Sequence, residues 1–84
     1  MLKQVVMKDK KDTIISAFYI ESSKVAYIKV SPCVNDNGKA VALYMQDREN
    51  AIVYFVSSDD NFIKKFVDLF NESNSANEIE INLN

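Results

Sequence analysis

The sequence predicts an α+β fold: an antiparallel sheet of four to six strands in a meander, one amphipathic helix packed on one face, and a short C-terminal strand. Three observations predict it. Segments rich in β-branched and aromatic residues recur along the first two thirds of the chain, with polar turns between them. A later segment repeats its apolar residues at helical spacing, and the last segment alternates apolar and polar residues. With 84 residues, the chain has room for a single domain, residues 1–84, with one small core.

The first part of the chain predicts two strands after a charged turn. Residues 8–12 form this turn, and residues 13–20 follow it as a strand. Apolar side chains fall on both faces of that strand, which favours a central strand covered on both sides; a short helix capped by Asp12 is the alternative. Residues 24–30 alternate as the next strand, with Val25 and Tyr27 expected on one face. Pro32 ends this strand, because proline cannot donate a ladder hydrogen bond.

Residues 40–46 and 51–57 predict a hairpin around a four-residue loop at 47–50. This loop length places Leu43 opposite Tyr54. One face of the hairpin then contains Val41, Leu43, Met45, Ile52, Tyr54 and Val56, and the other contains Ala42, Tyr44, Val53 and Phe55.

The segment at 35–38 reads Asn-Asp-Asn-Gly, and we expect a turn in which Gly38 has a positive φ. As a calcium loop with glycine at position six, it would place Cys33 at position one and Tyr44 at position twelve. Those positions require an acidic residue and a bidentate Glu. The segment therefore predicts a turn and no metal site.

The third part of the chain predicts a helix followed by a strand. Residues 57–60 read Ser-Ser-Asp-Asp, and these side-chain oxygens can accept the free N–H groups of a first helical turn. The helix covers about residues 60–71, and its apolar residues share one face: Phe62, Ile63, Phe66, Val67, Leu69 and Phe70. Residues 78–83 alternate strictly, which predicts a strand at a sheet edge with one solvated face.

The composition argues against catalysis. The chain contains no His or Trp and only one Cys, so Cys33 has neither a disulfide partner within the chain nor a His to activate it. The pair Asp59 and Asp60 fits helix capping, and Glu78 and Glu80 fit the solvated side of an edge strand. We therefore expect no enzymatic activity, no cofactor and no metal.

The charge is uneven along the chain. Residues 1–42 contain seven Lys and four acidic residues, whereas residues 43–84 contain three basic and eight acidic residues. The two halves either occupy different faces, which would create a dipole, or interleave and average out. The Lys cluster at 8–11 is broken by Asp9, so we expect no nucleic-acid binding. No apolar run approaches the roughly 20 residues of a membrane span, and we expect a soluble, cytoplasmic protein with neither a signal peptide nor membrane contact.

The hairpin predicts more apolar surface than one helix can cover. An exposed, tyrosine-rich face is typical of a protein-interaction surface. Our interpretation is a non-catalytic protein-binding domain, a small inhibitor or adaptor that acts by surface occlusion. Its candidate partner-binding residues are Tyr27, Tyr44 and Phe55 on this face, and Asp47, Glu49, Asp59 and Asp60 at the hairpin tip and helix start. The alternative is a face covered internally, either by a helix before residue 20 or by a sheet that curls on itself.

Two other hypotheses remain open. One is a structural homodimer that pairs through the second sheet face or through the edge strand at 78–83. The other is an acidic nucleic-acid mimic, which requires Asp47, Glu49, Asp59 and Asp60 on one surface and predicts strongly salt-dependent binding.

The order of a strand meander, an acidic turn, a helix with Lys65-Phe66 and Phe70, and a short closing strand resembles one type of small phage anti-CRISPR protein. Residues 1–23 have no counterpart in that pattern, and no site residue is carried over from it. The resemblance implies a small inhibitor encoded by a phage or another mobile element.

Overall fold

The computed structural model describes residues 1–34 and 37–83, and over these residues it has an α+β fold. A 3₁₀ turn at Ser22–Lys24 joins the second strand to the third, and one α-helix lies between the fifth strand and the sixth. The elements are β1 (Leu2–Lys8), β2 (Ile14–Glu21), β3 (Val25–Pro32), β4 (Lys39–Met45), β5 (Val53–Ser57), α1 (Asp60–Leu69) and β6 (Glu78–Asn82). The predicted fold class is confirmed.

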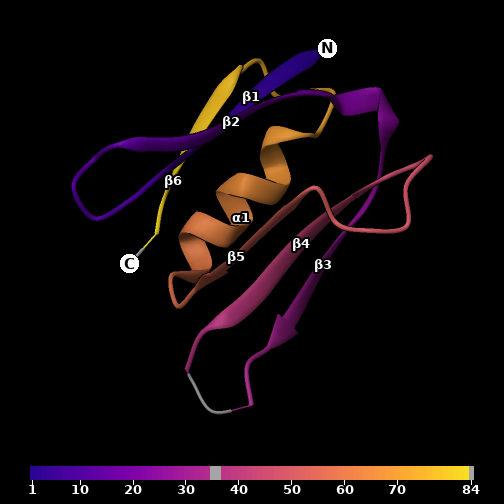
Figure 1. The fold of residues 1–84 in the computed structure, drawn as a ribbon. Helices are drawn as coiled ribbons and strands as arrows, with labels where there is room; N and C mark the ends of the chain where they lie inside the picture. Colours follow the sequence, from indigo (N-terminus) through magenta and orange to yellow (C-terminus); the bar gives the residue numbers. More distant parts are fainter. Residues whose placement is uncertain (35–36, 84) are drawn as a thin grey trace.

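The strands divide into two three-stranded sheets (Figure 1). Sheet A has the order β2-β1-β6, with β1 antiparallel to β2 and parallel to β6. Sheet B has the order β3-β4-β5 and is antiparallel throughout. This arrangement differs from a single meander because α1 returns the chain to the far side of β1, where β6 runs in the same direction as the first strand.

The helix α1 begins where the sequence predicts. Asp59 is its N-cap, and the Asp59 carboxylate accepts a hydrogen bond of 3.1 Å from the backbone N–H of Phe62. This bond satisfies one of the N–H groups that have no partner within the helix. The helix ends at Leu69, two residues before the predicted end.

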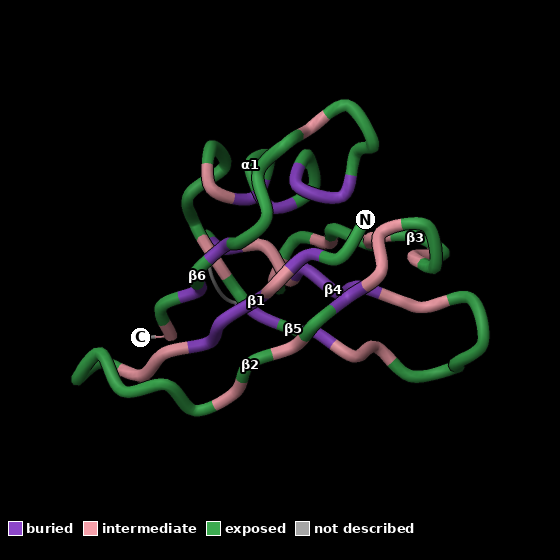
Figure 2. Tube along the Cα trace, turned by 90° about the horizontal axis from the view of Figure 1, so that it is seen from above, coloured by how far each residue is buried: buried purple, intermediate pink, exposed green. Residues whose placement is uncertain are grey.

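The inner faces of both sheets and the apolar face of α1 form one core. In Figure 2, the buried positions of α1 lie on the side of the helix nearest the strands. Phe66 is completely buried, and its ring lies edge-on to Phe55 of β5 at 5.0 Å and to Phe70 at 5.4 Å between centroids. The rest of the core is aliphatic: Val5, Met7, Ile20, Val41, Leu43, Val53, Ile63, Leu69, Ile79 and Ile81.

The segment at 13–20 is a strand, as predicted, but the interpretation of a central strand covered on both sides is wrong. β2 is an outer strand of sheet A, and β1 is the central one. Tyr19 is 68% exposed, and Ile14 and Ile15 are also exposed. β2 is therefore covered on its inner face, where Ile20 is buried and Phe18 packs against the core, and uncovered on its outer face. The alternative of a helix capped by Asp12 is wrong.

The hairpin of β4 and β5 is confirmed, but the predicted register is wrong by one residue. Leu43 pairs with Val53, and Val41 pairs with Phe55. β4 ends at Met45 and β5 begins at Val53, so the connection at residues 46–52 is longer than the predicted four residues. A shift of one residue exchanges the two faces of a strand. Phe55 consequently faces the core, and Tyr54 faces outward.

The side chains of β3 do not alternate regularly between the two faces of sheet B. Val25 pairs with Met45 and Tyr27 with Tyr44, so Ala26 is an extra residue without a partner in β4. This irregularity turns Val25 toward the core and Tyr27 away from it, and the expectation that they share a face is wrong. The strand ends at Pro32, as predicted.

Gly38 is needed for a close contact rather than for a left-handed backbone. No described glycine has a positive φ, so that expectation is wrong. A Cβ atom added to Gly38 would lie 3.0 Å from Cγ1 of Val56 on β5. Asn35 and Asp36, which belong to the predicted turn at 35–38, lie outside the described residues.

Candidate functional site

The outer face of sheet B is rich in tyrosine. Residues that lie opposite each other in antiparallel strands point to the same side of a sheet. The register pairs Tyr27 with Tyr44, and it aligns Ala42 with Tyr54 across β4 and β5. We call this surface the tyrosine face; it consists of Tyr27, Lys29, Ser31, Ala40, Ala42, Tyr44, Tyr54 and Val56.

The tyrosine face exposes aromatic rings around a buried alanine. The rings of Tyr27 and Tyr44 stack with centroids 4.6 Å apart and an angle of 19° between their planes. Tyr27 is 55% exposed and Tyr54 is 59% exposed, so neither ring is covered by another element. Ala42 on the central strand is only 7% exposed, so the larger side chains around it shield its methyl group. The alternative of a face covered internally holds for Val53 and Phe55, which lie in the core, and not for the tyrosines.

The predicted aromatic residues separate in the structure. Tyr27 and Tyr44 lie on the same face, as predicted. Phe55 is only 3% exposed and packs against Phe62 and Phe66 of α1, so its placement beside the tyrosines is wrong. The one-residue change of register puts Tyr54 on this face instead.

The four predicted acidic residues do not gather on one surface patch. Asp47 and Glu49 lie in the loop before β5, and Asp59 and Asp60 lie after β5, at the opposite end of the strand. The Asp59 carboxylate caps α1, and the Asp60 carboxylate forms an ion pair with the ammonium of Lys39 at 2.9 Å. Within residues 1–34 and 37–83, no three acidic or Cys side chains are close enough together to hold a metal ion.

The basic and acidic halves of the chain interleave. Each sheet contains strands from both halves, and the ammonium of Lys8 on β1 lies 3.2 Å from a carboxylate oxygen of Glu80 on β6. The hydrogen bond to Glu80 raises the pKa of Lys8 above its ordinary value of 10.5, although partial burial opposes this effect. Of the two arrangements that the sequence left open, the structure shows the one in which the two halves interleave.

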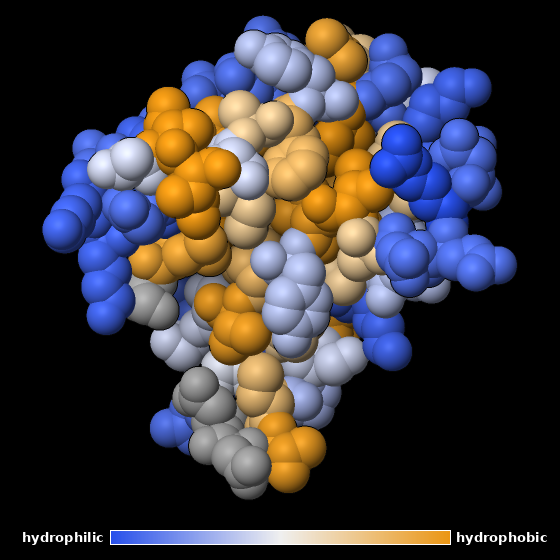
Figure 3. All heavy atoms as spheres, viewed as in Figure 1, coloured by the Kyte–Doolittle hydropathy of each residue, from blue (hydrophilic) through white to orange (hydrophobic). Residues whose placement is uncertain are grey.

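A groove of about 600 Å³ borders the outer edge of β2. One wall consists of four consecutive residues of β2, Ala17–Ile20. The other consists of Lys24 before β3 and of Met45–Arg48 and Ile52 around the loop between β4 and β5. In Figure 3, apolar residues gather in the middle of this side of the molecule, between hydrophilic margins. The sequence did not predict this groove, because it depends on how the two sheets meet.

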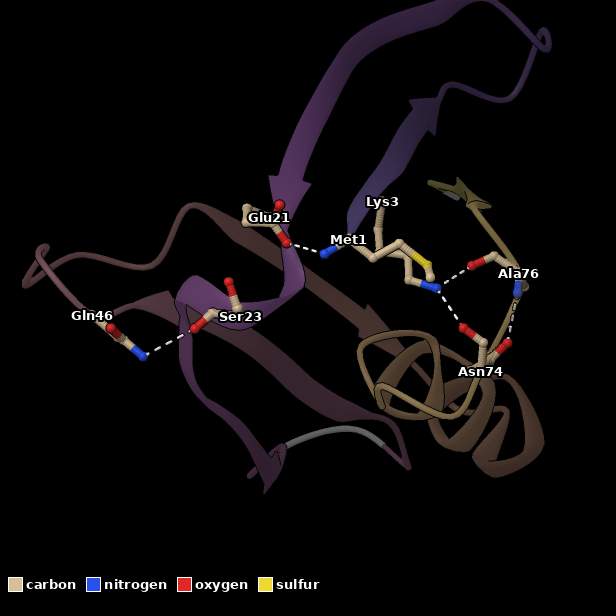
Figure 4. A network of polar contacts seen from close by, with 7 residues as sticks. All are labelled: Met1, Lys3, Glu21, Ser23, Gln46, Asn74 and Ala76. Atoms are coloured by element: carbon tan, nitrogen blue, oxygen red, sulfur yellow. Dashed lines mark hydrogen bonds and ion pairs between the residues drawn. The ribbon is translucent and has the colours of Figure 1, made fainter.

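A buried lysine fastens the segment after α1 to sheet A. Lys3 is 1% exposed, and its ammonium donates to the carbonyl oxygens of Asn74, at 2.8 Å, and Ala76 (Figure 4). Next to it, the backbone N–H of Gln4 donates to the carbonyl of Asn77. Three hydrogen bonds thus fix the approach of the chain to β6. We assign Lys3 a structural role, because both acceptors are main-chain atoms of this segment.

No protein family, curated protein or solved structure matches this chain. In the part of the chain that the structure describes, no helix is long and apolar enough to cross a membrane. The function is therefore inferred from the surfaces of the molecule alone.

Proposed function

We propose that this chain is a non-catalytic protein-binding domain, a small inhibitor or adaptor that covers part of its partner with the tyrosine face. The observation that supports the proposal is the grouping of Tyr27, Tyr44 and Tyr54 on one uncovered side of sheet B. Tyrosine is enriched at the energetic centres of interfaces, because it offers a large contact area at a small cost in side-chain entropy.

The chemistry of the tyrosine face indicates the kind of surface it would bind. Its exposed tyrosine rings suit a partner whose apolar side chains pack against them. Lys29 is the one charged residue among those that form the face. A partner carboxylate beside Lys29, with hydrogen-bonding groups near the tyrosine hydroxyls, would complete the fit.

Paired alanine variants test this proposal. Tyr54→Ala removes an exposed ring from the tyrosine face, and Tyr19→Ala removes an equally exposed ring from sheet A as a matched control. The wild type and the two variants each serve as bait under native conditions. The proteins that each bait captures are then quantified by mass spectrometry. We expect at least one captured protein to bind the wild type and Tyr19→Ala but to lose about 2 kcal/mol of binding free energy with Tyr54→Ala.

Circular dichroism and thermal melting show whether both variants keep the wild-type fold. Capture that is equal for the wild type and a folded Tyr54→Ala/Tyr27→Ala double variant would exclude the tyrosine face as the binding surface.

A further inference from the structure

The two sheets have four outer strands, and three of them are shielded from pairing with another chain. β3 contains the irregularity at Ala26, the charged Lys29 and the terminal Pro32. β5 has only five residues and lies against α1. β6 is equally short and carries Glu78 and Glu80. Short length, charge, proline and local irregularity are the features by which sheet proteins prevent contact between edges.

The fourth outer strand, β2, lacks this protection over most of its length. It has eight residues, and Ile14–Ile20 contains no charge, proline or glycine. Its pairing with β1 skips Ile15, so the regular part of the strand is Ser16–Glu21. In an antiparallel strand with one neighbour, about half of the backbone N–H and C=O groups point to the open side. Ser16–Glu21 therefore offers a regular set of hydrogen-bonding groups.

The groove beside β2 provides space for one more strand. Its β2 wall is made of consecutive residues, which point alternately to the two faces of sheet A, so the groove follows the backbone edge itself. A smaller hollow continues it from Phe18 along the loop residues Arg48–Ile52. A strand placed about 4.8 Å from β2 would direct alternate side chains toward Met45 and Ile52.

The sequence of β2 is complementary in size to a second copy of itself. Residues that face each other across an antiparallel pair lie on the same side of the sheet. When two β2 strands are centred on Phe18, the small Ser16 of one copy faces Ile20 of the other. Ala17 likewise faces Tyr19, and the two Phe18 rings meet on the groove side.

The charges near β2 also suit this arrangement. No charge lies within Ile14–Ile20, so the paired strands bring no like charges together. The turn before the strand contains Asp9 and Asp12 as well as Lys10 and Lys11, and the Glu21 carboxylate at the end of the strand is paired with the N-terminal ammonium. The flanking segments therefore bring no unbalanced charge to the paired strands.

From these observations we infer that two copies of the chain associate through β2, antiparallel and centred on Phe18. Their two A sheets join into one six-stranded sheet with the order β6-β1-β2-β2-β1-β6. The contact is two-fold symmetric and closed, so it produces a dimer and no larger assembly. It does not involve the tyrosine face, and the two proposals therefore stand or fall separately.

Engineered cysteines test the predicted pairing. In a Cys33→Ser background, Ala17→Cys and Tyr19→Cys both replace exposed residues, and these positions face each other across the proposed dimer. We expect a mixture of the two variants to form a disulfide-linked heterodimer several-fold faster than either variant alone. A matched mixture of Ala17→Cys with Tyr54→Cys, whose cysteine lies on the tyrosine face, should not do so. Equal rates in the two mixtures would overturn the proposed pairing.

Sedimentation equilibrium from about 5 µM to about 1 mM tests the dimer itself. We expect the mass to rise from 9.6 kDa toward twice that value. Ala17→Lys places a charge on the open edge and should raise the dissociation constant at least about tenfold. The control Tyr54→Lys should leave it unchanged. A wild-type protein that stays monomeric at 1 mM, or a dimer lost only with Tyr54→Lys, would overturn the inference.

Discussion

Sheets A and B share one core but have outer faces of different kinds. On sheet A, the central residue Val6 is buried although no helix or strand packs over it among the described elements. Long polar side chains cover it: Lys8 reaches Glu80 on one side, and Gln4 donates to the hydroxyl of Tyr19 on the other. On sheet B, the corresponding centre is Ala42, and the side chains around it are tyrosines.

One helix covers the inner faces of both sheets. α1 fills only the space between the inner faces, so each outer face depends on its own side chains. The aliphatic stems of Lys and Gln can cover an apolar centre while their polar ends remain in water. Stacked tyrosines leave aromatic area exposed instead. Sheet A is thus covered by polar side chains at the centre of its outer face and open at the edge of β2, whereas sheet B is protected at its edges and exposes tyrosine rings around its centre.

Removing the buried ring of Phe66, which belongs to the core between the two sheets, should have the largest effect. Phe66→Ala deletes a completely buried ring that contacts Phe55 of sheet B and Phe70 at the end of α1. We expect a loss of about 3–5 kcal/mol in the free energy of unfolding, measured by urea denaturation. The neighbouring, exposed Val67→Ala should cost less than about 1 kcal/mol. Sheet A melting separately from sheet B in Phe66→Ala would show that the two sheets do not depend on one core.

A smaller effect, confined to sheet A, is expected from Lys3→Met. This substitution keeps an apolar stem of similar length but leaves the carbonyls of Asn74 and Ala76 without the ammonium donor. We expect a loss of about 2 kcal/mol, with faster amide exchange in β6 than in sheet B. Lys10→Met on the exposed turn is the matched control and should leave exchange unchanged. If amide exchange in Lys3→Met became faster by the same factor in both sheets, a local role for Lys3 would be contradicted.

The smallest effect concerns the junction between the sheets. The N-terminal ammonium pairs with Glu21 at the end of β2, and its hydrogen bond lowers the pKa of Glu21 below the ordinary value of 4.5. Because the folded-state pKa is depressed, this pair stabilises the fold above pH 4.5, and its contribution disappears as the pH falls through the folded-state pKa. The melting temperatures of the wild type and Glu21→Gln should therefore differ slightly at pH 6. They should become equal when the pH is below the folded-state pKa of Glu21. A difference that grows on acidification would contradict this assignment.

Features set by neighbouring residues could be predicted from the sequence. The start of α1 depends on Asp59 and the following turn, and the alternation of residues 78–83 identifies β6 without knowledge of its partner. Tyr27 and Tyr44 could be placed on one face because they lie in strands joined by a turn.

Features set by distant contacts could not be predicted. The register of β4 and β5 is fixed by which residues α1 needs in the core, and Phe55 rather than Tyr54 meets Phe66. Apolar residues on both faces of β2 suggest a buried strand as readily as an exposed edge, and only the position of β6 on the other side of β1 decides between them. A lysine in a strand is normally expected in solvent, so nothing local marks Lys3 as buried.

The parallel pairing of β1 with β6 has a consequence for the order of folding. Gln4 pairs with Glu78, so sheet A acquires its third strand only by closing a loop that contains almost the whole chain. Sheet B and the β1–β2 hairpin need only short closures, and loop-closure entropy makes such contacts faster to form. We therefore expect β6 to dock last during folding and to leave first during unfolding. A chain still emerging from the ribosome would present β1 with an unoccupied side until residues 78–82 appear.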